Sequence, residues 1–376
     1  MGLVKTIYNV LGGFYVLYNN IIFTESVHKL SRKNEKFSYI FDKRFLIQEK
    51  RWRKSVQLLY VFREKQYNLG KKFMEKNIKL LKCFKEGNMK PIVYFSREIT
   101  PEKVLELYKL LDKKLEGNVA IKVHSGETGN QNFLRPAFWK PLIEHVGGTV
   151  VEANTAYEGT RNTTTKHLVT IREHGWNRDF DVEILDEEGP DEVFEIPNGK
   201  VIQKNYVGKN IKKYDSLLVL SHFKGHPMGG YGGALKQLSI GVASAFGKAY
   251  IHGAGVPEDI WTSDHDSFLR SMADAASSVV EYFKGNAVYV NVMKNMSVDC
   301  DCCAVAEDPC MKDIGILISL DPIAIDQACI DLVYAATDDP GQAHLLERIE
   351  SRNGVRTIEA AAELGFGSRE YELVEV

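Results

Sequence analysis

The sequence has no apolar run long enough to cross a membrane; residues 7–23 are apolar, but they are short and interrupted by three asparagines and two glycines. A single lysine precedes that run, which is too little charge for a cleavable signal peptide. The 376 residues also match neither the phosphate-binding loop nor the dinucleotide fingerprint. We therefore expect a cytoplasmic protein without a membrane span, and the sequence predicts no nucleotide site.

Basic residues are scarce in the larger part of the chain. Residues 89–376 carry 29 Lys and Arg against 43 Asp and Glu, whereas residues 1–88 carry 19 against 7. Because neutralising phosphates requires a basic surface, we expect residues 89–376 not to bind nucleic acid.

Residues 1–88 have two interpretations. They form a basic helical extension that binds an acidic partner or a membrane surface, or they are a translated leader that is not native protein. The second interpretation comes from "KEGNMKP", which can be back-translated to a purine-rich ribosome-binding sequence just before the codon for Met89. On either interpretation, we place the folded domain at residues 89–376.

Short runs rich in Val, Ile and Leu alternate with amphipathic segments from residue 91 onward. The pattern predicts strands at 91–96, 118–124, 148–154, 180–185, 216–222, 248–253, 287–293 and 314–320, with a small β-rich stretch near 193–203. It predicts helices at 100–115, 135–146, 163–174, 233–245, 264–284, 322–334 and 341–352. This alternation is typical of βαβ units. It predicts a single large α/β domain whose mainly parallel sheet has helices on both faces.

Polar side chains follow six of the predicted strands. They are His124, Glu127 and Asn130 after one strand, Asn154 and Arg161 after the next, the segment "SHFKGH", His252, a group of cysteines, and Asp321 and Asp326. Ligands of open α/β sheets bind outside the carboxyl ends of the strands. We therefore expect these segments to converge on one cleft.

The segment "SHFKGHPMGGYGGALKQLSIG" (221–241) places histidines and a lysine in a glycine-rich turn before a predicted helix. Free backbone N–H groups at a helix N-terminus favour an anion, so the segment predicts a carboxylate or phosphate site. The alternative is a glycine-rich turn with surface histidines. The predicted ligand contacts are Lys224, the amides of Gly229, Gly230, Gly232 and Gly233, and Asn154.

Four cysteines lie within "CDCCAVAEDPC": Cys300, Cys302, Cys303 and Cys310. Such a local group in a large chain more often binds metal than forms disulfides. Sulfur ligands favour an iron–sulfur cluster first and zinc second, and reactive or structural thiols are the remaining alternative. Successive side chains of an extended segment point to opposite sides, so Cys300, Cys302 and Cys310 are the preferred ligands. The fourth position is left to Cys303, a histidine or a substrate. Cys83 and Cys329 are not expected to be ligands.

Several long segments resemble the domain-of-unknown-function family 362, whose members are often labelled uncharacterised iron–sulfur center proteins. The resemblance runs from about Met89 to the C-terminus through "IKVHSGETGNQNFLRP", "LSHFKGHPMGGYGGALKQLSIG" and "VDCDCCAVAEDPCMKDIGILISLDPIAIDQACIDLVY". It implies one α/β domain with a cluster site, which we expect to be 4Fe–4S. The family's Lys-x-His motif falls on Lys224 to His226, and its C-x-C…P-C motif falls on Cys300, Cys302, Pro309 and Cys310. The chain departs from the family pattern at Cys303 and Gln237, and it lacks the separate ferredoxin-like cysteine repeat of many relatives.

The first functional hypothesis is an iron–sulfur protein that performs redox or Lewis-acid chemistry on a small anion. In it, Lys224 and the loop amides hold the anion, and His226, His124 or His252 transfers protons. An electron-transfer protein such as a ferredoxin would be its partner. The second hypothesis is a non-redox enzyme of racemase or lyase type, in which the histidines and Lys224 perform acid–base catalysis and the cysteines are structural or zinc-bound. The third is a metal- or cluster-carrying accessory protein without catalysis.

Overall fold

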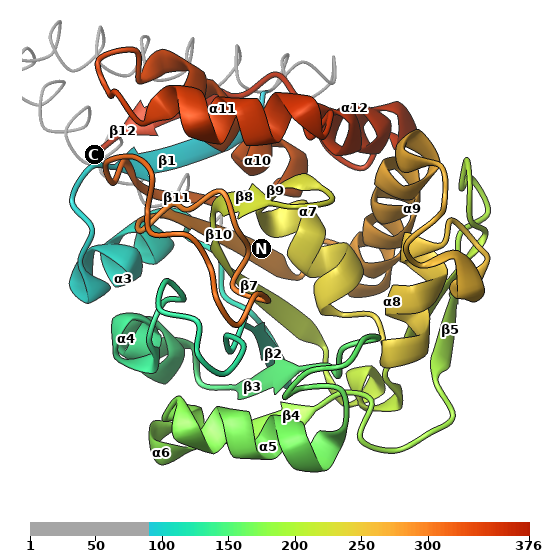
Figure 1. Cartoon of the computed structure of the whole chain (residues 1–376). Coiled ribbons are helices and arrows are strands. Elements are labelled where there is room, and N and C mark those ends of the chain that lie inside the picture. The colour runs from blue at the N-terminus through green and yellow to red at the C-terminus, as the bar shows by residue number, and fades with distance from the viewer. Residues whose placement is uncertain (1–89) are drawn as a thin grey trace, which may run out of the picture. The chain divides into compact units, whose positions relative to one another are not determined.

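The apolar, β-branched runs form one eight-stranded sheet in the computed structural model, which describes residues 90–376 (Figure 1). The expectations for residues 1–88, including Cys83, lie outside the described residues. The strand order is β12 (Glu372–Glu375), β1 (Ile92–Ser96), β11 (Gly315–Ser319), β10 (Ala287–Met293), β7 (Ser216–His222), β2 (Val119–Lys122), β3 (Thr149–Glu152) and β4 (Val182–Ile184). Only β11 runs antiparallel to its neighbours within this sheet. The mainly parallel sheet that the sequence predicted is confirmed.

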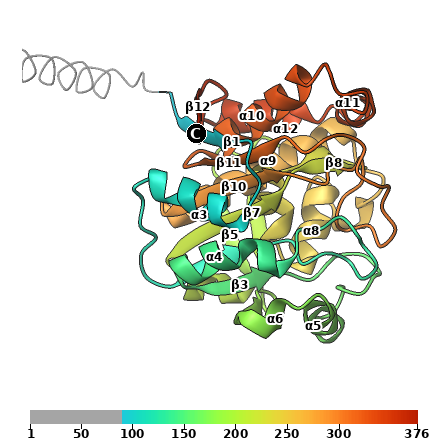
Figure 2. The same cartoon turned by 90° about the vertical axis from the view of Figure 1, so that its left-hand side faces the viewer.

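Helices cover both faces of the sheet. In β7, Leu217 and Val219 join one apolar cluster, whereas Leu218 and Leu220 join another. The first cluster includes side chains of α9 (His265–Phe283) and α10 (Pro322–Ala335). The second includes α3 (Pro101–Leu110) and α4 (Pro136–Val146), which lie toward the viewer in Figure 2. Burial on both faces explains why β7 is apolar along most of its length instead of alternating with polar residues.

Both margins of the domain contain helices or strands in addition to those that the sequence predicted. Helices α5 (Thr164–Glu173) and α6 (Trp176–Asp179) follow β3, and α11 (Gln342–Ser351) and α12 (Val355–Leu364) precede β12. The sequence predicted α5 and α11, but it did not predict α6, α12 or β12. None of the helices within residues 90–376 combines the length and apolar character that a membrane span requires.

The prediction of a strand at 248–253 is wrong. These residues lie in and just after α8 (Ala245–His252), which begins where the Ser244 hydroxyl accepts a hydrogen bond from the backbone N–H of Gly247. The buried positions of α8 include Gly247 with Ile251, and Lys248 with His252, which is the spacing of one helical face. A short apolar run such as "KAYIHG" does not distinguish a strand from a helix by periodicity alone.

The glycine-rich segment forms a hairpin in place of a simple turn. Strands β8 (Lys224–His226) and β9 (Gly230–Gly232) pair antiparallel and lead into α7 (Ala234–Lys236) and one π-helical turn, η3 (Gln237–Gly241). The predicted helix at 233–245 is therefore interrupted. Gly230 has φ +77 and would place a Cβ 2.6 Å from the Cα of Gly354, so this position requires glycine. A second hairpin, β5 (Glu192–Glu195) with β6 (Lys204–Val207), overlaps the predicted β-rich stretch.

Candidate functional site

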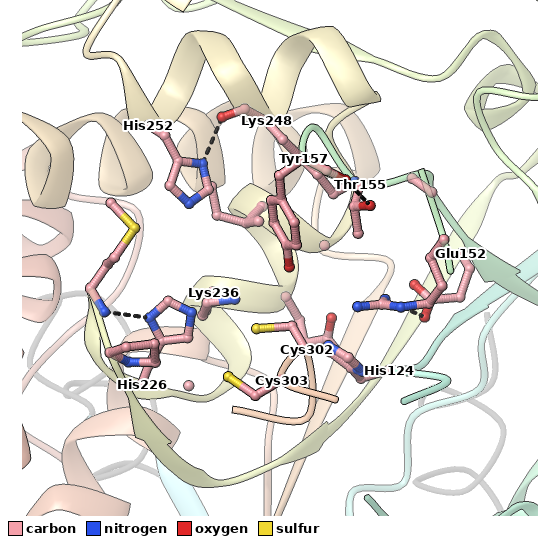
Figure 3. Close-up of a pocket in the computed structure, with 18 of the residues that line it drawn as sticks. His124, Glu152, Thr155, Tyr157, His226, Lys236, Lys248, His252, Cys302 and Cys303 are labelled. Carbon is pink, nitrogen blue, oxygen red and sulfur yellow. Dashed lines mark hydrogen bonds and ion pairs between the residues drawn. The ribbon is translucent and has the colours of Figure 1, made fainter. Parts of the chain in front are cut away.

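A cavity of about 410 Å³ lies where the chain leaves β2, β3 and β7 (Figure 3). His124 follows β2, Tyr157 and Arg161 follow β3, and Lys224 and His226 follow β7. The loop after β10 adds Cys302 and Cys303, and α8 adds Lys248 and His252. The structure thus brings together four of the expected strand ends, together with the helix that replaces the fifth.

The sixth expected segment does not reach the cavity through its strand end. Because β11 is antiparallel, its carboxyl end lies at the opposite edge of the sheet. Asp321 there caps α10 by accepting hydrogen bonds from the N–H groups of Ile323 and Ala324. It therefore stabilises a helix end far from the cavity edge.

His226 and Cys302 line the cavity, and the buried Cys300 lies beside them; we call these three residues the Cys/His group. Their candidate ligand atoms all lie within 4.8 Å of one another. Cys303 lines the same cavity, and Figure 3 shows its sulfur close to that of Cys302. Cys310 is outside this group, and its thiol donates to the carbonyl oxygen of Met296 at 3.3 Å. Of the three preferred cysteine ligands, the structure brings two together.

The loop that carries the cysteines is held in place by the polar segment after β2. The backbone N–H of Glu127 donates to the carbonyl of Asp301 at 2.9 Å. Three consecutive side-chain amides also donate to loop carbonyls: Asn130 to Cys303 at 2.9 Å, Gln131 to Ala306 at 2.7 Å and Asn132 to Glu307 at 2.8 Å. The segment "GETGNQN" therefore positions the thiols through backbone contacts.

The Lys224 ammonium is neutralised within the protein. Its Nζ lies 3.0 Å from a carboxylate oxygen of Asp301, and Nδ1 of His222 lies 3.0 Å from the same carboxylate. Burial alone would raise the pKa of Asp301, but His222 and Lys224 outweigh it and hold the pKa well below its usual range. Lys224 lines the cavity, yet its charge is directed at Asp301.

Two imidazoles near the thiols are held as proton donors toward the cavity. Nδ1 of His226 accepts the N–H groups of Gly229 at 2.8 Å and Met228 at 3.2 Å. Nδ1 of His124 accepts the N–H of Gly126 at 3.1 Å. Burial lowers the pKa of each ring to about 4. Each neutral ring therefore carries its proton on Nε2.

His252 has the opposite tautomer. Its Nδ1 donates to the carbonyl of Lys248 at 2.7 Å, which leaves Nε2 as the acceptor, and its ring stacks on Phe268 at 4.9 Å. Burial lowers its pKa to about 4. Figure 3 shows His252 and Lys248 on α8, across the cavity from Cys302 and His226. The cavity therefore contains imidazole donors near the thiols and an imidazole acceptor on the other side.

Three cations form a second set, Arg161, Lys236 and Lys248, which we call the cationic group. The Nε of Arg161 lies 2.9 Å from Glu127 and its Nη1 lies 4.0 Å from Glu152, but Nη2 is buried without a hydrogen-bond partner within residues 90–376. Lys248 donates to the carbonyl of Ala243 at 2.5 Å, and burial lowers its pKa to about 7. The cavity therefore contains cations whose charge the neighbouring carboxylates do not fully balance.

Sequence reasoning missed most of the charged cavity residues. Lys122 and Glu152 form a buried ion pair at 2.6 Å, and neither was selected, nor were Lys236 and Lys248. One signal was present: a single charge inside the apolar runs "VAIKVH", "TVVEAN" and "AFGKAY". A charge in such a position is buried and needs a partner or a ligand.

The protein itself uses one of the predicted glycine amides, that of Gly229, and two amides at the start of α7. The N–H groups of Ala234 and Leu235 donate to the Asp326 carboxylate at 2.8 and 2.9 Å, and the N–H of Gly229 donates to His226. Gly232 and Gly233 line the cavity. The side chain of Asn154 bonds to Thr164 at 3.0 Å and to His167 at 3.2 Å. Asp326 therefore occupies the helix N-terminus that was expected to receive an anion.

The site defines an α/β protein with a thiol, imidazole and ammonium cavity at the carboxyl edge of its sheet. The profile of the family described as Domain of unknown function (DUF362) matches residues 119–331, more than half of the chain. The chain belongs to this family, as the sequence motifs had indicated. The sequence matches none of the curated proteins.

Solved structures give partial and distant matches. The lactate racemase apoprotein from Thermoanaerobacterium thermosaccharolyticum is 17% identical with a TM-score of 0.34, and the match covers 54% of this chain and 51% of that one. A protein from Thermotoga maritima is 14% identical with a TM-score of 0.37, and the match covers 70% of this chain and 59% of that one. The chain thus spans about half of the racemase and less than two thirds of the second protein.

Proposed function

We propose that this protein is an enzyme that binds a small organic anion in the cavity and acts on it beside a soft metal ion held by the Cys/His group. One observation carries the proposal: the ligand atoms of two thiols and an imidazole lie within 4.8 Å of one another, and Cys302 and His226 of this group line a cavity that the cationic group also lines. Thiolate and imidazole ligands select zinc, iron and similar metals over hard cations.

The donor set fits one ion better than a 4Fe–4S cluster. With metal–sulfur bonds of about 2.3 Å, two thiolates on one tetrahedral ion lie roughly 3.8 Å apart, which suits this group. A 4Fe–4S cluster is held by about four thiolates on separate irons. Cys310, the thiol that would complete the expected cysteine trio, instead donates to Met296. We therefore assign Cys300, Cys302 and His226 as the ligands, with Cys303 within reach.

The protein's own groups have separate tasks in this proposal. The cationic group holds the anion, and the buried Lys224, Asp301 and His222 fix the loop that carries the thiols. His124 presents an Nε2–H donor and His252 presents an Nε2 acceptor, so a proton can be given on one side and taken on the other. A metal ion bound here would supply Lewis-acid or electron-transfer chemistry.

A second candidate, acid–base catalysis of racemase or lyase type without metal, is favoured by the tautomer of His226. Metal-bound histidines usually donate their second N–H to an acceptor. Nδ1 of His226 instead accepts two backbone N–H groups, so its Nε2 must lose a proton before it can bind metal. In this alternative, Nε2–H of His226 acts as a proton donor and the thiols stay uncoordinated.

Metal analysis of the full chain purified without oxygen tests the proposal. We expect about one metal ion per chain, lost from Cys300→Ser and Cys302→Ser because two thiolates supply most of the binding. Cys310→Ser should keep the ion, whereas a cluster bound through Cys310 would be lost with its visible absorption and its inorganic sulfide. Cys329→Ala is the matched control, since Cys329 is buried in α10 against Asn291.

Two results would contradict the metal proposal. One is wild-type protein without bound metal, even after incubation with zinc or ferrous iron under reducing conditions. The other is a Cys300→Ser, Cys302→Ser double variant that keeps its fold and its metal. Either result would leave acid–base catalysis as the function that the cavity supports.

A further inference from the structure

Arg161 is an unusual residue within the cavity, because it is 3% exposed and part of its guanidinium has no partner. Glu127 binds Nε at 2.9 Å, and Glu127 is itself fixed by the backbone N–H of Thr160 at 2.6 Å. Glu152 lies 4.0 Å from Nη1. The guanidinium is therefore held rigidly from one side, while the buried Nη2 is left without a partner. A buried donor without a partner is costly, so a ligand that accepts this hydrogen bond would be favoured.

Lys236 and Lys248 add positive charge to the same cavity. Other lysines of the cavity have carboxylate partners within 4.0 Å, as Lys122 has Glu152 and Lys224 has Asp301. Neither Lys236 nor Lys248 forms such an ion pair with another residue of the described part of the chain. The cavity therefore has an excess of positive charge in a buried environment, where charge interactions are stronger than in water.

The shape and chemistry of the cavity distinguish between anions. A planar guanidinium matches a carboxylate through two parallel hydrogen bonds. The backbone amides that would cradle a phosphate at the helix start are bonded to Asp326 and His226 instead. Part of the lining is apolar: Ala153, Met228 and Ile240. We propose that Arg161, Lys236 and Lys248 form a subsite for the carboxylate group of a small organic acid with a short apolar body.

This inference rests on the proposed function and names its substrate class. Cys302 and His226 line the same cavity as Arg161 and the two lysines, and Figure 3 shows Lys236 beside His226, so an acid held by the subsite would lie in the cavity that the Cys/His group adjoins. The subsite replaces the anion contacts that the sequence had assigned to Lys224 and the glycine amides.

Isothermal titration calorimetry of the full chain with sodium propionate and, separately, inorganic phosphate tests the subsite. We expect propionate to bind, and Lys236→Met and Lys248→Met each to weaken it at least about tenfold, because each removes a charged contact. Arg161→Lys, which keeps the charge but loses the planar fork, should weaken it as well. Lys109→Met, at an exposed position of α3, is the control and should bind propionate as the wild type does.

The outcomes separate this inference from the proposed function. Tighter binding of phosphate than of propionate, no binding of propionate, or unchanged binding in Lys236→Met and Lys248→Met would overturn the carboxylate subsite. Metal content is measured on the same variants and should stay at the wild-type value in all of them. Loss of metal from Cys302→Ser with propionate binding retained would support the subsite and the metal site independently, and an Arg161 variant that fails to fold would leave the two lysine variants to decide.

Discussion

Lys224 and Lys248 line the same cavity and are buried to a similar degree, with 4% and 6% of their surface exposed. Their pKa values are nevertheless displaced in opposite directions. Burial lowers the pKa of both ammonium groups, but Asp301 outweighs it at Lys224 and leaves that pKa raised. At Lys248 burial prevails over Asp186, and the pKa falls to about 7. The difference is a carboxylate at ion-pair distance, and it separates a lysine used by the fold from one available to a ligand.

The same distinction applies to the two groups of side chains in the cavity. Around the Cys/His group, the neighbouring polar groups are bonded within the protein, as Asp301 is to Lys224 and His222. In the cationic group, Nη2 of Arg161 and the two lysines lack protein carboxylates of their own within residues 90–376. Removing a charge should therefore lower the stability of the fold around the Cys/His group, whereas it should weaken ligand binding in the cationic group.

The largest expected effect is the loss of stability when Lys224 is replaced. Lys224→Met leaves Asp301 buried with His222 as its remaining ion-pair partner, and removing one member of a buried pair costs about 3–5 kcal/mol in the free energy of unfolding. Lys236→Met removes no ion pair and should change that free energy by no more than about 0.5 kcal/mol. Chemical denaturation of both variants measures the difference. Equal losses in the two would show that Lys236 has a structural partner as important as Asp301.

The second prediction concerns the stability of the fold at acidic pH. Burial gives His252 a pKa of about 4 in the folded chain, against 6.5 for the unfolded value. Below pH 6.5 the unfolded state binds a proton that the folded state does not, so the free energy of unfolding falls as pH decreases from 6.5 to 4. The loss due to this ring alone is about 3 kcal/mol.

Denaturation at pH 7 and pH 4.5 measures that loss. His252→Phe keeps a ring against Phe268 and should lose less stability on acidification than the wild type. The control is His344→Phe, at a position whose side chain is 52% exposed, which should keep the wild-type response. A variant at His252 with the full acid response would show that its protonation is not coupled to unfolding.

The central architecture was predictable because it depends on local pattern. The buried strands β7 and β10 were predicted with their observed bounds, since each is a continuous β-rich run. The antiparallel direction of β11 was not predicted, because the direction of a strand depends on how the chain returns to the sheet. The strand prediction for 248–253 was wrong because its few apolar residues are compatible with a strand or a helix. The Ser244 cap stabilises the helix.

The site was predictable in its residue types but not in its pairings. Cys302, His226 and Lys224 were selected from sequence and do line the cavity. That Asp301 neutralises Lys224, or that Asp326 occupies the helix N-terminus, depends on contacts between residues 77 and 92 positions apart, respectively. A lysine beside glycines looks the same in sequence whether its charge is compensated or free. The role of Lys224 in anion binding stays a prediction, and Lys248 was not selected from sequence.

The smallest expected effect is a change in the protonation of Lys248 when a carboxylate binds. Its pKa of about 7 results from burial together with the nearby charges of Lys122 and Arg161, which act against Asp186 and Glu152. A carboxylate bound beside it raises that pKa, because an opposite charge favours the protonated amine. At pH 8 the binding of propionate should therefore take up a fraction of a proton, and its affinity should fall as pH rises above 7.

Calorimetry of propionate binding in Hepes and in Tris, two buffers with different ionisation enthalpies, measures this uptake. Lys248→Met should abolish the uptake, whereas Lys236→Met should weaken binding and keep it. This pairing separates the two lysines of the cationic group, since both contribute charge but only Lys248 changes protonation in the neutral range by our assignment. An uptake that survives in Lys248→Met would assign the proton to another group of the cavity. Binding without uptake in the wild type would contradict the placement of the carboxylate beside Lys248, because it would mean that propionate does not change the protonation of this amine.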